Sequence, residues 1–487
     1  MDLRLVPAAL TSWAVTAAGI LWLQAGAAAA ALGAVACTVL AGWWGARRSA
    51  GGLDRRALAA GVLAVALVGG GFAVAVSVRV GAVHDHPITT YFGSITSVTV
   101  KPAETPRVLV GGRTMIRGSL LVLDGAETSG DVLVFASGAD YSTLTAGQPA
   151  AFRAQVGRPK RRDLTVAVLS ATGAPVRGEA APIQRAAHHL RTRFAESARL
   201  ALPAGEAAML PALVLGDTSA VPAETTAEFR VSGLTHLTAV SGANVTIVCG
   251  AVLMSALLIG PRAAVGLAAV TLVAFVVIVQ PSPSVLRAAV MGAITLVAVL
   301  AHRRRQALPA LAATVIALMI GAPRLAVDVG FALSASATAA LVVLAPAWSR
   351  RLTGRGWPKP LADAVAVALA AQLVTAPLVA GVSGSVSLVA VAANLVVAPV
   401  IPPITVIGTA AAALCALWPA GAELLIRFTG PEVWWLLSVA RYAAGLPAAS
   451  VPVPSGVAGA ATVAAAAVAL GVVWHWAVSE RRGTIDR

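Results

Sequence analysis

The feature of this sequence that most constrains its fold is a series of apolar runs, each of about 18 or more residues, that recurs along the chain. A run of this length crosses a hydrocarbon core about 30 Å thick as an α-helix, because a helix satisfies its backbone hydrogen bonds internally. The composition agrees, with 58% hydrophobic residues, 12% charged residues and a mean hydropathy of +0.83. A soluble domain with this balance would aggregate. The sequence therefore predicts a polytopic α-helical membrane protein.

Residues 1–78 carry about three predicted transmembrane helices. The first apolar stretch, 5–23, resembles a signal peptide, but a second apolar segment follows directly and ends at Trp43 and Trp44. Aromatic residues beside a basic loop are typical of the cytoplasmic membrane surface, and the arginines here are Arg47, Arg48, Arg55 and Arg56. We therefore expect an uncleaved helical hairpin, and then a helix over 57–78 that returns to the outer side.

Residues 79–180 have a different composition from the segments on either side. Short β-branched runs such as SITSVTV (94–100) and DVLVFASG (131–138) alternate with Gly, Pro and Asp. This pattern predicts a small extracytoplasmic β domain of about five strands, and it fits a barrel or a sandwich equally.

The next segment, 181–232, is predicted to form amphipathic or interfacial helices. Apolar residues recur there at helical spacing, interspersed with Arg185, Arg191, Arg193 and Arg199. A cationic amphipathic helix on the membrane surface fits this pattern, and packing under the β domain is the alternative.

Residues 233–478 form a second membrane region with room for about eight or nine helices, followed by a basic tail, 479–487. Basic loops mark its cytoplasmic side at Arg303, Arg304 and Arg305 and at Arg350, Arg351, Arg355 and Lys359. Counting helices from these loops puts the C-terminus outside, whereas the basic tail favours the inside. A broken or re-entrant segment within 386–419 would reconcile the two, and Pro399, Pro402 and Pro403 permit one.

The most specific motif is GLTHLTAVSGANV, residues 233–245. It places His236, Ser241 and Asn244 in or at the mouth of an otherwise apolar helix, where polar groups are costly. Ser241 and Gly242 either mark a helix break that lines a passage or let two helices pack closely. Further polar residues interrupt the apolar core at Arg287, Asp328, Gln372 and Asn394.

These motifs resemble those of the ComEC-type competence family, which imports DNA. The resemblance is carried by Gly233, Leu234, His236, Leu237, Ala239, Val240, Ser241 and Gly242, by LVLGDTS (213–219), by PSVLRAAVMG (283–292), by VDVGFALSASAT (327–338), by AQLVTAPL (371–378) and by AANLVVAPV (392–400). With the early helices and the β domain it covers nearly the whole chain. It implies an OB-like β domain outside the bacterial cytoplasmic membrane and a channel for single-stranded DNA in natural transformation, without enzymatic activity.

Two departures from the family pattern bear on function. Many relatives have a second histidine where this chain has Asn244, so we expect no metal site or paired-imidazole relay. Many relatives also carry a metallo-β-lactamase-like domain, whereas this chain has no HxHxDH motif, so we expect no nuclease in this polypeptide. The HDHP sequence at 84–87 is interpreted as a solvated turn. No cofactor is expected.

The polar residues of the apolar core and the cationic residues of the β domain each have more than one possible role. With the topology above, His236, Arg287 and Asp328 lie near the outer ends of their helices and are hypothesised to converge on one outer mouth. An ion pair between Arg287 and Asp328 is the alternative, since a charge at membrane depth needs a partner or water. Asn394 near Pro399 fits either a passage or contacts between helices. In the β domain, Phe152 lies near a cationic strip that could hold single-stranded DNA or be a solvated face: Arg153, Arg158, Lys160, Arg161 and Arg162.

Three functions are compatible with these features. The leading one is a conduit for single-stranded DNA, with membrane lipid around it and with a DNA receptor, a cytoplasmic motor and a separate nuclease as partners, since the chain has no Walker loop. The second is a secondary transporter in which His236 and Asp328 carry protons. The third is a hydrolase using Ser241 and His236, which a continuous helix would disfavour, because five positions subtend about 140°. The sequence leaves the oligomeric state open.

Overall fold

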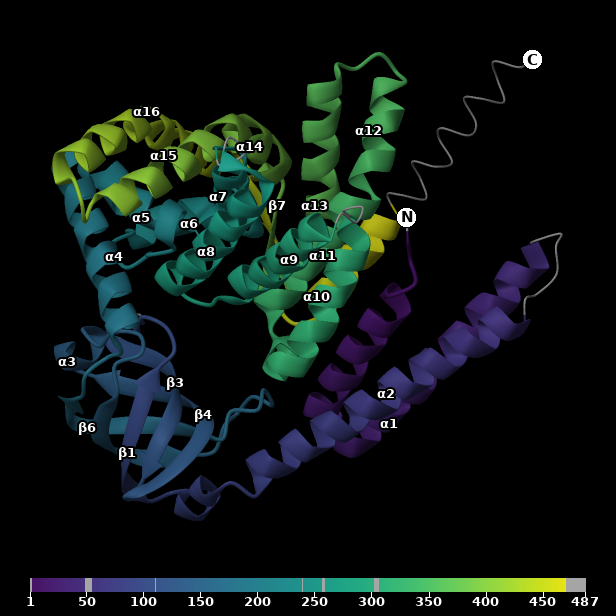
Figure 1. Cartoon of the computed structure of the whole chain (residues 1–487), viewed down its shortest axis with the longest axis horizontal. Coiled ribbons are helices and arrows are strands. Elements are labelled where there is room, and N and C mark those ends of the chain that lie inside the picture. Colours follow the sequence, from purple (N-terminus) through teal and green to yellow (C-terminus); the bar gives the residue numbers. More distant parts are fainter. Residues whose placement is uncertain are drawn as a thin grey trace. The chain divides into compact units, whose positions relative to one another are not determined.

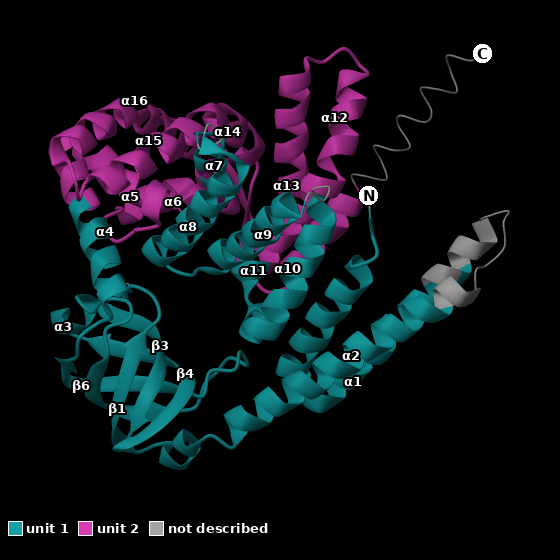
Figure 2. Ribbon diagram, viewed as in Figure 1, with its two compact units in different colours: residues 1–193, 249–331 teal, residues 194–248, 332–487 magenta. Residues whose placement is uncertain are grey.

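The computed structural model describes residues 2–48, 55–109, 111–238, 240–255, 259–301 and 306–469. The chain forms two compact units, each built from two separate stretches of sequence (Figure 2). Unit 1 comprises Met1–Arg193 and Cys249–Phe331, and unit 2 comprises Phe194–Val248 and Ala332–Arg487. Each unit is described by itself below.

The amino-terminal part of unit 1 consists of α1 (Val6–Arg48) and α2 (Arg55–His84) (Figure 1). Helix α1 turns back on itself, because Trp22 and Leu23 leave the helical conformation. Gly26 permits the tight reversal, since a Cβ there would lie 2.5 Å from the carbonyl oxygen of Ala18. These are the predicted hairpin and third helix. Helix α2 continues to His84, six residues beyond the predicted end at Val78. Arg79 therefore lies within the helix.

A closed five-stranded barrel follows α2 and a short 3-10 helix, η1 (Pro87–Tyr91). Its elements are β1 (Ile95–Pro102), β3 (Arg113–Leu123), β4 (Ala126–Ser137), α3 (Ala139–Ser142), β5 (Ala150–Gly157) and β6 (Ala167–Arg177), with β2 (Arg107–Val108) added on β3. Strand β1 pairs with both β3 and β5, which closes the sheet, and β4 pairs with β6 in parallel. This strand order is that of an OB fold.

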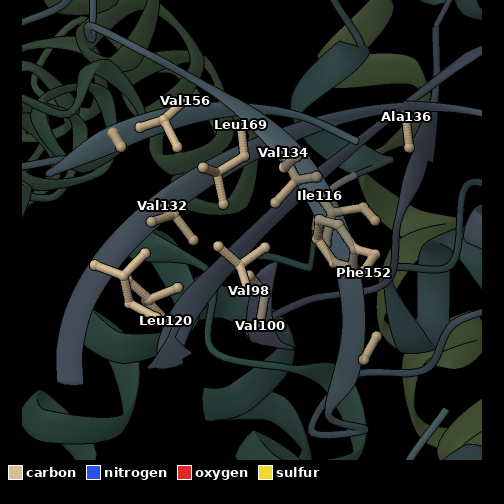
Figure 3. Close-up of a cluster of buried hydrophobic side chains, with 14 of the residues drawn as sticks. Val98, Val100, Ile116, Leu120, Val132, Val134, Ala136, Phe152, Val156 and Leu169 are labelled. Carbon is tan, nitrogen blue, oxygen red and sulfur yellow. The ribbon is translucent and has the colours of Figure 1, made fainter. Parts of the chain in front are cut away.

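The barrel closes around side chains that alternate along each strand (Figure 3). In β1 the buried positions are Thr96, Val98, Val100 and Pro102, separated by exposed or half-buried residues. A strand with this period turns every second side chain toward one face, and closure removes the sheet edges. Of the two arrangements that the sequence pattern allows, the β domain therefore has the barrel.

Helix α4 (Pro182–Ala201) connects the barrel to the remaining helices. Its buried stripe includes Ala187, Arg191, Phe194 and Ala198, which recur at helical spacing. Arg191 is 7% exposed and donates a hydrogen bond to the carbonyl oxygen of Ile278. This stripe of α4 therefore contacts protein, while most of the helix is exposed, and its contact with the membrane surface stays a prediction.

The remaining helices are strongly apolar. Helix α7 (Gly242–Ser255) joins the two units in sequence, and unit 1 then contains α8 (Pro261–Val279), α9 (Pro283–Leu300), α10 (Ala307–Gly321) and the 3-10 helix η4 (Pro323–Val327). Unit 2 contains α5 (Ala204–Leu215), α6 (Ala223–Val231), η2 (Thr235–Leu237), most of α11 (Val329–Val343), α12 (Ala345–Thr353), α13 (Lys359–Ser383), α14 (Ala390–Val397), η5 (Ala398–Val400), α15 (Ile401–Leu414), α16 (Pro419–Ala444), and the strand pair β7 (Ser385–Ser387) and β8 (Ser450–Pro452).

Seven helices in the described residues are long and apolar enough to cross a membrane. Five of these lie between residues 233 and 478, where shorter apolar helices occur at Gly242–Ser255, Ala307–Gly321 and Val457–Ala469. The chain is thus a multi-pass α-helical membrane protein with an OB-like barrel. Two of the basic segments used for the prediction, 303–305 and 479–487, lie outside the described residues.

The segment predicted to be broken is interrupted by η5, which separates α14 from α15. Pro399, Pro402 and Pro403 fall in or next to this turn. Proline suits the first turn of a helix, because the N–H groups there have no partner within the helix. The prolines therefore mark the point where α15 begins.

Candidate functional site

The barrel is fixed to the ends of the apolar helices of unit 1 by specific polar contacts. Gln280, in the loop between α8 and α9, forms two hydrogen bonds with Thr105: its Oε1 accepts from the Thr105 N–H at 2.9 Å, and its Nε2 donates to Thr105 Oγ1 at 2.8 Å. Gln280 has a φ of 73°, a left-handed conformation that costs energy for a residue with a side chain. The two hydrogen bonds stabilise that conformation.

Two arginines add further contacts between the barrel and the helices. Arg324 of η4 forms an ion pair with Asp131 of β4 at 3.2 Å. Arg162, in the loop between β5 and β6, donates a hydrogen bond to the carbonyl oxygen of Leu21, at the reversal of α1. The reversal of α1, the α8–α9 loop and the segment before α11 therefore all lie on the barrel side of unit 1.

Arg287 and Asp328 lie near this side but are held by different groups. A Cβ on Gly330 would be 3.9 Å from Pro283, so α11 begins beside the first turn of α9, which carries Arg287. Asp328 Oδ1 accepts a hydrogen bond from the Phe331 N–H at 2.8 Å and caps α11. Among the described residues no ion pair joins Asp328 to Arg287. The ion-pair alternative is therefore not the observed arrangement.

Arg287 itself is buried, with 6% of its surface exposed. Its Nη1 lies 4.0 Å from the sulfur of Met291, one helical turn further along α9. A guanidinium carries five N–H donors and stays charged, so a buried position commits it to polar surroundings.

The GLTHLTAVSGAN segment lies in unit 2 and is irregular rather than a single helix. It runs from the end of α6 through the 3-10 turn η2 to the start of α7 at Gly242. Gly233 has a φ of 75°, and a Cβ there would collide with Ala390 at the start of α14. His236 is exposed on η2. The prediction of a helix break at Ser241 and Gly242 is confirmed in the backbone.

Three groups form a hydrogen-bonded chain at this break. Ser241 Oγ donates to Asn244 Oδ1 at 3.1 Å, and Asn244 Nδ2 donates to the carbonyl oxygen of Leu213 at 3.0 Å. Leu213 lies in the last turn of α5, where backbone carbonyls lack donors from their own helix. Asn244 is 6% exposed, and its amide can donate and accept at once. This explains how an asparagine suits the position.

This geometry also changes the argument about the hydrolase alternative. His236 and Ser241 do not share a helix, so the angular separation on a helix does not apply. Among the described residues, no hydrogen bond joins their side chains, and the Ser241 hydroxyl donates to an amide oxygen, which is not a general base. The arrangement does not activate Ser241 as a nucleophile.

A small cavity lies beside the Ser241–Asn244 pair. Its volume is about 10 Å³, near the minimum that holds one water molecule, and it is lined by Leu213, Leu237, Ser241, Asn244, Ile401, Ile404 and Thr405. Thr405 is buried on α15, one turn after the break at η5. The two interruptions of unit 2, before α7 and before α15, therefore meet at the same small cavity.

Gln372 and Ser387 extend the polar contacts of unit 2 toward Gly233. Gln372 Nε2 lies 3.5 Å from the carbonyl oxygen of Ser387, a weak hydrogen bond. A Cβ on Gly233 would be 3.3 Å from Ser387 Oγ, which is buried and has no hydrogen-bond partner among the described residues. Asn394, by contrast, donates to the Ala390 carbonyl oxygen of its own helix at 2.8 Å. Its observed partner is therefore a carbonyl of its own helix and not a group of another helix.

In the barrel, the cationic strip lies on the surface but its predicted aromatic neighbour does not. Arg153, Arg158, Lys160, Arg161 and Arg162 are exposed. Phe152 points into the core and packs edge-on against Tyr141, so it cannot stack on a base. The aromatic residue next to the strip is Phe92, whose ring centroid is 5.5 Å from the Arg158 guanidinium carbon.

The HDHP sequence is solvated at His84, Asp85 and Pro87, as predicted, but not at His86. His86 is buried, and its Nδ1 accepts from the Ile88 N–H at 3.1 Å while its Nε2 lies 3.1 Å from Thr128 Oγ1. Both ring nitrogens are therefore engaged in holding η1 on β4. Within the described residues no group of three or more His, Cys, Asp or Glu side chains could hold a metal ion.

The structure thus divides these predicted residues between the two units. Ser241, Gly242 and Asn244 share one site in unit 2, while Arg287 and Asp328 lie near the barrel side of unit 1. Sequence reasoning missed Leu213, Thr405 and Gln280. Leu213 acts through its backbone carbonyl, and Thr405 lines the cavity only because α15 packs there. Gln280 depends on the conformation of its loop. For Thr405, its place next to Pro402 and Pro403 was the available signal.

Comparison with known proteins gives one match, which covers the part of the chain that holds these motifs. No curated protein and no solved structure matches the chain. The model of the competence protein family matches residues 213–478, which is more than half of the chain. The matched range includes both Leu213 and Asn244, which are joined by a hydrogen bond. The chain belongs to the competence protein family, which points to a role in the uptake of DNA during competence.

Proposed function

We propose that this protein is the membrane conduit through which one strand of DNA enters the cytoplasm during natural transformation. The observation that carries the proposal is the attachment of an OB-type barrel to the ends of the apolar helices of unit 1, including the loop that leads into the helix of Arg287. OB folds commonly bind single strands, and this one presents cationic side chains next to Phe92.

The orientation of the barrel follows from the distribution of charge along the same helices. The barrel contacts the reversal of α1, the α8–α9 loop and the segment before α11. The opposite ends of these helices carry the arginine-rich connections at 47–56 and 303–305. Cytoplasmic loops are enriched in Lys and Arg, so this asymmetry supports an extracytoplasmic barrel.

The route proposed for DNA leads from the barrel into the helices. A strand bound at Arg153, Arg158, Lys160 and Arg161 would pass from there to the α8–α9 loop, to which the barrel is attached. Within unit 2, the breaks before α7 and α15 would supply polar backbone, because irregular backbone at membrane depth requires protein or water beside it.

The protein would act as a passive conduit and not as an enzyme. The sequence has no Walker loop, so a cytoplasmic motor would drive transport, while a DNA receptor would deliver the substrate and a separate nuclease would degrade the second strand. No cofactor is needed for this role.

The test is uptake of labelled DNA by cells that lack the gene and express either the wild type, Arg287→Ala or His236→Ala. Loss of internalised single strands in the null strain and in both variants, at normal membrane abundance, is expected. Arg427→Ala, which removes an exposed arginine of α16, serves as the matched control and should transport normally. Normal internalisation by the null strain would refute the proposal.

A further inference from the structure

A groove in unit 1 contains none of the residues proposed for DNA transport. It runs between α2 and the end of α10, and Thr16 of α1 forms part of its floor. Its volume is about 350 Å³. Val68, Phe72 and Ala75 line one wall, one above another at helical spacing, and Met319 and Ile320 line the other. Its walls are almost wholly apolar, and Arg79 lies at one end.

The position of the groove along α2 matches one leaflet of a bilayer. The 23 helical steps from Arg56 to Arg79 span about 35 Å, slightly more than a hydrocarbon core of about 30 Å. Leu67 lies at the midpoint of this span and at the inner end of the groove. From Leu67 to Arg79 the helix rises about 18 Å, so the groove extends from the membrane centre to the barrel-side interface.

The length and lining of the groove fit a hydrocarbon chain. The rise of about 18 Å from Leu67 to Arg79 corresponds to one leaflet, which is the depth that a lipid acyl chain occupies. The CH₂ groups of an acyl chain match the apolar walls.

Arg79 gives the interfacial end of the groove a positive charge. Its Nη2 donates to the carbonyl oxygen of Ile320 at 2.7 Å, which fixes the guanidinium across the end of the groove. Ile320 lies in the last turn of α10, so its carbonyl has no donor from its own helix. Arginine has five N–H donors, so one hydrogen bond leaves others for a phosphate oxygen.

We infer that this groove binds an anionic phospholipid of the barrel-side leaflet, with one acyl chain along α2 and the phosphate group on Arg79. Gly71 lines the groove, and a Cβ built on it would meet no atom within 4 Å. The space beside Gly71 is therefore empty, and a larger side chain would occupy it. The site is independent of DNA transport, so its test does not depend on the function proposed above.

The test uses the purified full chain in mild detergent with dioleoyl phosphatidylglycerol or dioleoyl phosphatidylcholine added, followed by native mass spectrometry. The wild type should retain one phosphatidylglycerol molecule at about tenfold lower lipid concentration than phosphatidylcholine. Gly71→Leu fills the groove and should weaken retention of both lipids. Gly70→Leu, on the neighbouring exposed position where a Cβ also meets no atom, is the matched control and should bind as the wild type does.

A second variant tests the charge. Arg79→Gln should abolish the preference for phosphatidylglycerol while the chain still binds at the level seen for phosphatidylcholine. If Arg79→Gln unfolds, a photoactivatable phosphatidylglycerol mapped on the wild type keeps the inference testable, and it should label peptides of α2 and α10. Equal retention of both lipids by the wild type, unchanged retention in Gly71→Leu, or labelling confined to other helices would each overturn the inference.

Discussion

The Nδ2 of Asn244 donates a hydrogen bond to the carbonyl oxygen of Leu213, 3.0 Å away and 31 residues earlier in the chain. This bond ties the start of α7 to the end of α5, and so joins two of the motifs that identify the family. It lies inside unit 2, beside a cavity with room for about one water molecule. A side chain here must donate to Leu213 and accept from Ser241 at once, which an amide can do.

Replacing Asn244 with alanine should destabilise the protein by about 1–3 kcal/mol, because it leaves a buried carbonyl without a donor. Thermal unfolding of the full chain in detergent measures the effect. Ser241→Ala should cost less, since the Asn244–Leu213 bond remains. Equal stability of Asn244→Ala and the wild type would show that water replaces the amide in the cavity.

Gly233→Ala should lower stability sharply, because the new Cβ collides with Ala390 and because φ at this position is 75°. Each cause costs about 1–3 kcal/mol. The double variant Gly233→Ala/Ala390→Gly removes the collision but keeps the unfavourable φ. It should therefore recover part of the loss in a thermal unfolding assay. A double variant no more stable than Gly233→Ala would mean that the collision is not a source of the loss.

Asp328 offers a test of capping against charge. Asn can accept the hydrogen bond from the Phe331 N–H as Asp does, whereas Ala cannot. Asp328→Asn should keep both stability and DNA uptake near the wild-type level, and Asp328→Ala should lose about 0.5–2 kcal/mol. Loss of uptake in a well-folded Asp328→Asn variant would instead assign the carboxylate charge to the transport pathway.

Arg161 and Arg162 are neighbours with different expected roles. Arg162 is committed to the Leu21 carbonyl, whereas Arg161 is exposed on the predicted DNA strip. Binding of a labelled single strand to the full chain in nanodiscs should weaken in Arg161→Ala, and the slope of log K against log salt should fall by about 0.7.

Arg162→Ala provides the comparison for this measurement. It should lower the melting temperature of the protein, because it removes the donor at the reversal of α1, and it should change DNA affinity less than Arg161→Ala does. A salt slope that is the same in Arg161→Ala and the wild type would remove Arg161 from the DNA strip.

The sequence by itself determined that the chain is a multi-pass membrane protein, that it begins with three helical segments and that the β domain follows them. Apolar run length and side-chain alternation are local properties, which depend on the period of a helix or a strand. The break at Ser241 and Gly242 was also predictable, since polar and small residues in an apolar segment mark irregular backbone. The motifs sufficed to identify the family.

Tertiary structure decided which groups these residues meet. Barrel closure required β1 to pair with both β3 and β5, and it turned Phe152 into the core and left Phe92 beside Arg158. Asp328 became a helix cap, and Asn244 found a carbonyl in another helix. Such partners are often backbone groups, which every residue carries alike, so side-chain identity cannot specify them in advance. They are fixed only when separate segments pack together and leave particular carbonyls and amides without donors or acceptors of their own.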